Sequence, residues 1–182
     1  MSLLFTPRDP GTTGDIVDLT PEDAGWEWCG LRVLRLAPGT PVTVRTGASE
    51  MFVLPLAGGL RVEVRPAADD TPATALATYD LVGRDSAFTR VTDFAYVGRD
   101  HVATLTSQTT AEVALPSARC HRVLPPAYGA AEEVPVEVRG AGQASRQVTN
   151  FGVPGVWDHA DKLICCELIT PDGNWSSYPP HK

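Results

Sequence analysis

The sequence lacks the long apolar run that a membrane helix requires. No uninterrupted hydrophobic stretch among its 182 residues approaches the roughly 20 residues needed to span a bilayer. The N-terminal residues MSLLFTPRDPGTTGD contain no basic segment followed by a sustained apolar stretch, so they do not resemble a secretory signal. We therefore expect a cytoplasmic protein with no membrane partner.

Positive charge is also scarce. The sequence holds 15 lysines and arginines against 22 acidic residues, which gives a net charge of −7. The basic residues are scattered singly and form no stripe, so we expect no nucleic-acid partner. A dinucleotide-binding turn is missing too, because Gly140-Ala141-Gly142 lacks the third glycine of that motif.

Cysteine pairs with metal-binding or redox spacing are absent. The 4 cysteines, Cys29, Cys120, Cys165 and Cys166, show no CxxC spacing. We expect reduced cysteines in or near the core. Because side chains alternate along a strand, Cys165 and Cys166 should point to opposite faces.

Short apolar runs rich in Val, Leu and Thr are interrupted by 16 glycines and 16 prolines, which predicts a mostly β protein. Apolar and charged residues alternate over residues 60–65, as in a half-buried strand. The apolar run at 51–56 and the segment Ala57-Gly58-Gly59 predict that this strand belongs to a hairpin. Further elements are expected as strands at 30–36, 41–45, 93–97, 101–107 and 111–116, a helical turn at 20–26 capped by Thr20, and a surface loop at 66–80. Regular short strands of this kind favour a closed barrel or a sandwich.

A change in composition toward Pro, Gly, Ala and charge at residues 124–147 is typical of an interdomain connection. We expect a first domain over residues 1–125, a connection over 126–150, and the first strands of a second domain over 151–182. Alternating valines at 134–138 predict a strand within the connection.

The spacing of residues 39–58 resembles the first motif of the cupin barrel family. That motif carries two histidines at i and i+2, which aim both imidazoles into the barrel. Arg45 and Gly47 stand at the histidine positions here, whereas Glu50 matches the acidic position and His101 fits the end of the second motif. Two ligands are too few for an ordinary catalytic metal. We therefore expect a first cupin without metal, in which Glu50 is a hydrogen-bonded or rim carboxylate and His101 is a polar residue at a strand start.

The C-terminal sequence is more specific. Residues 170–182, TPDGNWSSYPPHK, together with RQVTNF at 146–151 and KLICCEL at 162–168, resemble the 5-deoxy-glucuronate isomerase family of myo-inositol catabolism. Members of that family contain two cupins, so the resemblance implies an N-terminal cupin plus the truncated start of a second. It also implies an aldose-ketose isomerase, an intramolecular oxidoreductase that converts 5-deoxy-glucuronate into 5-keto-2-deoxygluconate.

The same resemblance implies a divalent metal, zinc, manganese or iron, bound in the full-length family. In the family a His-Lys-His pair begins the metal site, and a glutamate and a later histidine complete it. Only His181 of these ligands falls within this sequence, so we expect an incomplete site, no bound catalytic metal and no activity for this chain alone. For the carboxylate of a small sugar-acid substrate the candidate ligand is Arg146, because a guanidinium can hold a carboxylate with two hydrogen bonds. A surface or interdomain salt bridge is the alternative role for Arg146. No residue is a compelling general base.

Two other functions remain open. One is the related cupin isomerase of the pectin pathway, 4-deoxy-5-hexulose-uronate ketol-isomerase. The other is a non-catalytic module that binds a sugar acid or mediates dimerisation. We expect a homodimer, because the loss of most of a second barrel would expose the edge of the strand at 162–170.

Overall fold

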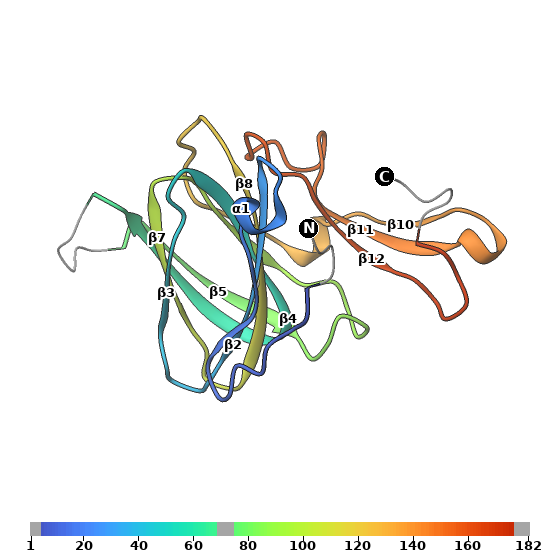
Figure 1. Cartoon of the computed structure of the whole chain (residues 1–182), viewed down its shortest axis with the longest axis horizontal. Coiled ribbons are helices and arrows are strands. Elements are labelled where there is room, and N and C mark those ends of the chain that lie inside the picture. Colours follow the sequence, from blue (N-terminus) through green and yellow to red (C-terminus); the bar gives the residue numbers. More distant parts are fainter. Residues whose placement is uncertain (1–4, 69–74, 177–182) are drawn as a thin grey trace.

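One long strand, β4 (Ser49–Pro66), passes through both layers of a β barrel. In the computed structural model, which describes residues 5–68 and 75–176, the first half of β4 pairs with β8 (Ala111–Arg119) and β6 (Phe94–Val97). The second half of β4 pairs with β5 (Ala77–Arg84) and β7 (His101–Thr106). The remaining elements are β1 (Gly14–Leu19), α1 (Pro21–Ala24), β2 (Cys29–Leu36), β3 (Val42–Arg45) and β9 (Ala127–Gly129). One layer has the order β1-β2-β8-β4-β6-β9, and β3 joins the other layer through β7 (Figure 1).

The hairpin predicted for residues 51–65 is wrong, because both apolar runs belong to this single strand. Gly58 has a φ of +77°, which glycine adopts without steric cost. The pairing register shifts between Pro55 and Ala57 against β8, and between Gly58 and Leu60 against β5. Such bulges bend a strand and increase its twist. The glycines therefore turn β4 from one layer into the other instead of reversing its direction.

Alternate residues of β4 enter two separate hydrophobic clusters. Met51 and Val53 belong to the interior cluster of the barrel, whereas Phe52 and Leu54 belong to a second cluster on the outside of the barrel wall. A strand that is buried on both faces is apolar at every position, which explains the continuous hydrophobic run there. In residues 60–65 the predicted alternation is confirmed, since the apolar members are buried and the charged members face outward.

A separate three-stranded sheet follows the barrel in the order β10 (Val136–Arg139), β11 (Arg146–Gly152) and β12 (Cys165–Ile169). Two single-turn 3-10 helices, η1 (Ala131–Glu133) and η2 (Gly142–Ala144), precede β10 and β11. We call this the second sheet. Figure 1 shows it as an orange and red arm that extends away from the barrel. Phe151 and Cys165 of this sheet pack in the outer cluster, so the outer face of β4 and β6 is the surface on which it rests.

Most of the other predicted elements are present in the structure, and one loop is shorter than predicted. The expected mostly β, cupin-like fold is confirmed, and the other predicted strands correspond to β2, β3, β6, β7, β8 and β10. The helical turn is confirmed as α1, capped by the side chain of Thr20. The loop predicted at 66–80 is wrong at its end, because β5 begins at Ala77, and residues 69–74 lie outside the described part. The domain limits at 125 and 150 remain predictions.

The cysteines are free thiols with two different environments. Cys120 and Cys165 are buried, as expected, whereas Cys29 and Cys166 are exposed, so the prediction of core positions is wrong for the second pair. Cys165 and Cys166 lie on opposite faces of β12, which confirms the predicted alternation.

No helix within residues 5–68 and 75–176 is long and apolar enough to cross a membrane.

Candidate functional site

The second sheet carries a polar face. Arg139 lies directly opposite Arg146 in the β10–β11 pairing, and Glu137 lies opposite Val148. Residues paired in this way share one face of a sheet, so both arginines and Glu137 lie on the same side. Asn150 joins them, because its Nδ2 donates a hydrogen bond to Glu137 Oε1 at 2.7 Å. We call Glu137, Arg139, Arg146 and Asn150 the polar face.

Arg146 is a cation without an anion on this face. Its Nη1 donates to the carbonyl oxygen of Ala144 at 3.1 Å, and its buried Nε has no hydrogen-bond partner. Arg139, in contrast, is bound to Glu137 at 2.6 Å. That contact, followed by the hydrogen bond from Asn150, holds the pKa of Glu137 below its usual value. Within the described residues Arg146 therefore does not form the salt bridge that was its alternative role, and no carboxylate there neutralises its charge.

The local sequence makes room for Arg146 at the turn between β10 and β11. Gly140 has a φ of +83°, in the left-handed region that favours glycine. A Cβ added there would come within 2.9 Å of Arg146 Nη1 and would collide with the backbone of Ala144. Glycine at this position therefore allows the Arg146 side chain to lie over the turn.

A buried carboxylate fixes the second sheet to the barrel. Glu50 is fully buried and accepts a hydrogen bond from the Tyr96 hydroxyl at 2.6 Å. It also accepts hydrogen bonds from the backbone N–H groups of Asp161, Lys162 and Leu163 at 2.9, 2.6 and 2.8 Å. Burial, reinforced by the neighbouring carboxylate, raises the pKa of Tyr96, so its hydroxyl stays a donor. These bonds hold the segment that leads into β12, and they confirm the prediction that Glu50 is a hydrogen-bonded carboxylate.

A second contact, which the sequence did not predict, joins the barrel to β12. Arg84 of β5 has a fully buried side chain, and its Nη2 lies 2.5 Å from Glu167 Oε2. Its Nε also donates to the carbonyl oxygen of Pro55 at 3.0 Å. The two partners are 83 residues apart, so no local pattern pairs them. The available signal was the alternation of Cys165 and Glu167, which places both on the barrel side of β12.

The described residues do not fit a metal site. His101 alternates along β7 with interior core residues, whereas Glu50 faces the outer cluster, so the barrel wall separates the two side chains. His101 Nδ1 lies 2.7 Å from the carbonyl oxygen of Arg99, so this nitrogen donates its proton there. Residues 5–68 and 75–176 contain no group of three or more His, Cys, Asp or Glu side chains that could hold a metal ion. His181 lies outside the described residues.

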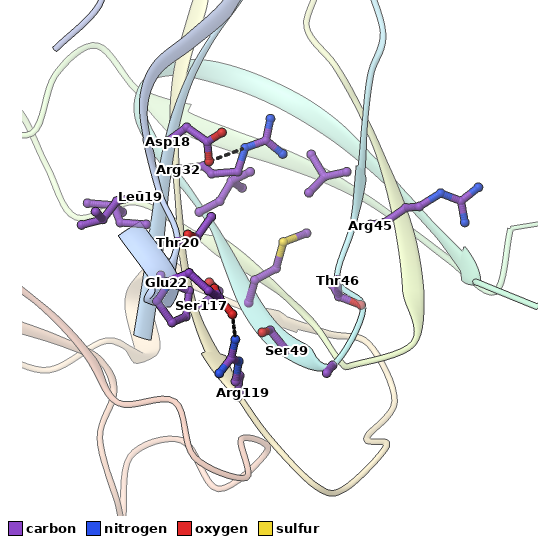
Figure 2. A pocket seen from close by; sticks show the side chains of 17 residues that line it. Asp18, Leu19, Thr20, Glu22, Arg32, Arg45, Thr46, Ser49, Ser117 and Arg119 are labelled. Carbon is purple, nitrogen blue, oxygen red and sulfur yellow. Dashed lines mark hydrogen bonds and ion pairs between the residues drawn. The ribbon is translucent and has the colours of Figure 1, made fainter. Parts of the chain in front are cut away.

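A cavity of about 330 Å³ opens at one end of the barrel. We call it the barrel-mouth cavity. Two ion pairs line it, Asp18 with Arg32 and Glu22 with Arg119 (Figure 2). No sequence pattern predicts this cavity, because it forms only when β8 pairs with residues of β2 and β4 that come more than 50 residues earlier in the chain.

Known proteins resemble this chain over nearly its whole length. The model of the KduI/IolB family matches residues 4–182. The chain is 35% identical to the 5-deoxy-glucuronate isomerase of Geobacillus kaustophilus (strain HTA426), with 100% of this chain and 63% of that protein covered. It is 32% identical to the 5-deoxy-glucuronate isomerase of Geobacillus thermodenitrificans (strain NG80-2), with 98% and 62% covered.

The structure is similar to that of an IolB-like protein from Salmonella typhimurium LT2, with a TM-score of 0.80 and 29% sequence identity. The match covers 98% of this chain and 64% of that chain. The chain thus spans less than two thirds of the length of these relatives.

Proposed function

Because the chain belongs to the KduI/IolB family, we propose that it forms the N-terminal part of a sugar-acid isomerase resembling 5-deoxy-glucuronate isomerase. The reaction is the conversion of the aldose 5-deoxy-glucuronate into the ketose 5-keto-2-deoxygluconate. A proton moves between adjacent carbons of the sugar in this reaction, so a base and a fixed substrate orientation are required. The names of the curated relatives support this reaction, and the polar face supports the binding of an acidic substrate.

The observation that carries the proposal is the buried, unpartnered Nε of Arg146. A buried donor without a partner costs about 1–3 kcal/mol. Arg139 is paired with Arg146 across the β10–β11 ladder, and like charges at paired positions destabilise a sheet. A uronate carboxylate on the polar face would accept hydrogen bonds from Arg146 and reduce both costs. Arg146 would then hold the acid group of the sugar and so orient its carbonyl end.

The proposal includes a divalent metal, but its candidate ligand, His181, lies outside the described part of the chain. His181 is proposed as its first ligand, and the described residues add no cluster of donors to complete the site. We therefore derive no reaction step through a metal. The isolated chain is expected to retain no divalent metal after dialysis and to show no isomerase activity.

We also propose a cytoplasmic homodimer. Val136 and Val138 are exposed on the face of β10 opposite the polar face. Burial of such residues by a second copy would gain free energy in proportion to the apolar area removed from water.

The test compares isomerisation of 5-deoxy-glucuronate by the 182-residue chain and by the longest protein that its gene encodes. Arg146→Ala in the active form should lower kcat/KM roughly 10- to 100-fold, as expected for a lost charge-assisted hydrogen bond. Arg146→Lys should recover only part of this loss, because lysine lacks the planar fork. The matched control is Arg61→Ala, which removes an exposed arginine paired with Asp80 at 2.7 Å on β4 and should leave activity within about twofold.

Three outcomes would contradict the proposal. Full activity of Arg146→Ala would remove Arg146 from substrate binding. Faster conversion of 4-deoxy-5-hexulose-uronate would favour the pectin-pathway isomerase. Binding of sugar acids without turnover by either form of the protein would favour the non-catalytic module.

A further inference from the structure

The barrel-mouth cavity has an apolar part and a polar part. Val44, Met51 and Leu115 of the interior cluster line it. Ser49 and Ser117 lie two residues from Met51 and Leu115, so alternation places both serines on the same interior face. The volume of about 330 Å³ lies at the lower end of the range for small-molecule pockets. At about 30 Å³ for each water it holds roughly ten waters, the space of a ligand with about a dozen non-hydrogen atoms.

Two hydroxyls in this cavity are unused by the protein. Neither the Ser49 nor the Ser117 side chain makes a hydrogen bond with another residue in the described part of the chain. Gly30 lies directly opposite Ser117 in the β2–β8 pairing, and a Cβ at Gly30 would come within 2.8 Å of Ser117 Oγ. Glycine therefore keeps this hydroxyl accessible. Figure 2 shows Ser49 and Ser117 among the cavity side chains, near the Glu22–Arg119 pair.

The charges of the cavity are already paired. Arg32 donates to both carboxylate oxygens of Asp15 at 3.0 and 3.2 Å, and its Nε lies 3.7 Å from Asp18. Arg119 forms an ion pair with Glu22. Both guanidiniums are thus occupied by carboxylates of the protein. Of these carboxylates only Asp18 and Glu22 line the cavity, so the two carboxylates and the two guanidiniums balance.

The remaining arginine of the lining does not change this balance. Arg45 is exposed and follows the inward-facing Val44 on β3, so its side chain is on the outer face. Figure 2 shows the Arg45 side chain directed away from the other labelled residues. An anionic ligand would therefore meet the carboxylates of Asp18 and Glu22 and two guanidiniums that carboxylates of the protein already hold. A neutral ligand with many hydroxyls can donate to the carboxylates and accept from Ser49 and Ser117.

We propose that the barrel-mouth cavity binds a neutral polyhydroxylated six-membered ring, a pyranose sugar or a cyclic polyol. The apolar face of the ring would lie against the aliphatic part of the cavity, and its hydroxyls would bind the serines and the paired charges. This site is separate from the polar face of the second sheet and does not depend on the isomerase function. Its specificity is opposite to that of Arg146, because it excludes the carboxylate that Arg146 is proposed to bind.

The test uses two probes that share one ring. The ¹⁵N-labelled 182-residue chain is titrated with D-glucose and with D-glucuronate, in which a carboxylate replaces the neutral hydroxymethyl group. D-glucose at millimolar concentrations should shift the amide resonances of Thr46, Ser49 and Ser117. The dissociation constant for D-glucuronate at this site should be higher by about tenfold or more, because like charges then face each other. Absence of a D-glucose response, or equal or tighter binding of D-glucuronate, would overturn the proposal.

Two variants locate the binding. Ser117→Leu fills part of the cavity and removes one hydroxyl that the ligand would bind. It should therefore weaken D-glucose binding by about tenfold or more. Thr43→Leu makes a similar change on the exposed outer face of β3 and should leave the affinity unchanged. If Ser117→Leu does not fold, the double variant Ser49→Ala/Ser117→Ala removes both hydroxyls without added bulk. Retention of the original affinity by a folded variant of either kind would overturn the assignment.

Discussion

Replacing Glu50 by glutamine tests how the second sheet is held on the barrel. The variant keeps the size of the side chain but removes its charge and one of its two acceptor oxygens. Oε1 accepts from the N–H groups of Lys162 and Leu163, and Oε2 accepts from the Tyr96 hydroxyl. The Asp161 N–H is shared, at 2.9 Å from Oε2 and 3.2 Å from Oε1. The amide of glutamine would keep the first pair as neutral hydrogen bonds. Its NH₂ group would then face the Asp161 N–H, while the Tyr96 hydroxyl can rotate to accept instead.

The expected loss of stability follows from the hydrogen bonds that the substitution changes. The partly buried Asp161 N–H loses the nearer of its two acceptors, which costs at most about 1–3 kcal/mol. Two charge-assisted hydrogen bonds become neutral ones, with a loss of roughly 0.5–1.5 kcal/mol each. The lower desolvation cost of a neutral side chain offsets part of this sum. We expect a loss of about 2–4 kcal/mol in the free energy of unfolding.

Urea unfolding followed by circular dichroism measures that loss, and native-state hydrogen exchange locates it. The amides of Asp161, Lys162 and Leu163 should exchange faster in Glu50→Gln, because they have lost a charged acceptor. Glu112→Gln is the control, since Glu112 pairs with Arg35 at 2.9 Å in a partly exposed position and should cost less than about 1 kcal/mol. A Glu50→Gln protein as stable as the control variant, with unchanged exchange at these amides, would refute the reasoning.

Two further predictions concern single positions. Gly83→Ala should destabilise the protein by several times more than Gly155→Ala. Both glycines have positive φ, at +67° and +82°, a conformation that costs alanine about 1–2 kcal/mol, but only at Gly83 would a Cβ collide with the carbonyl of Gly58. Equal losses in thermal unfolding would contradict this distinction. Burial raises the pKa of Cys120 to about 11 and that of Cys165 to about 12, so both thiols stay protonated and unreactive near neutral pH. Iodoacetamide should label the two exposed cysteines first, and mass spectrometry showing equal labelling of all four in the native protein would be the contrary result.

The strands could be predicted from sequence because burial with a period of two is a local pattern. The alternation in residues 60–65 identifies both the strand and its buried face. The connection through Gly58 and Gly59 could not be predicted in the same way. A tight hairpin and a bend within one strand both use glycine, and they differ only in which distant strands pair on either side. That choice depends on β5, β6, β7 and β8, which come later in the chain.

The candidate site was only partly accessible to sequence reasoning. Arg146 was found through its place in a family-like segment, whereas its lack of a partner depends on the three-dimensional positions of Ala144 and Arg139. Glu50 was assigned to a cupin motif by spacing, and spacing does not determine which side of the barrel wall a residue faces. Glu50 lies two residues before Phe52 on the same strand. Because Phe52 faces outward, alternation places Glu50 on the outer side as well.

The two faces of β4 explain what the first barrel contributes to the protein. Its interior is filled by aliphatic side chains and has no metal cluster among the described residues, so its inner face supports only the barrel and the mouth cavity. Its outer face carries Glu50, which holds the segment before β12, and the neighbouring β5 carries Arg84, which holds Glu167 in the middle of β12. Because β12 pairs with β11, these contacts also fix the sheet that carries Arg146. Loosening Glu50 should therefore disturb carboxylate binding at Arg146 while leaving the mouth cavity on the opposite face of the strand unchanged, which makes the barrel a positioning element for the proposed isomerase site.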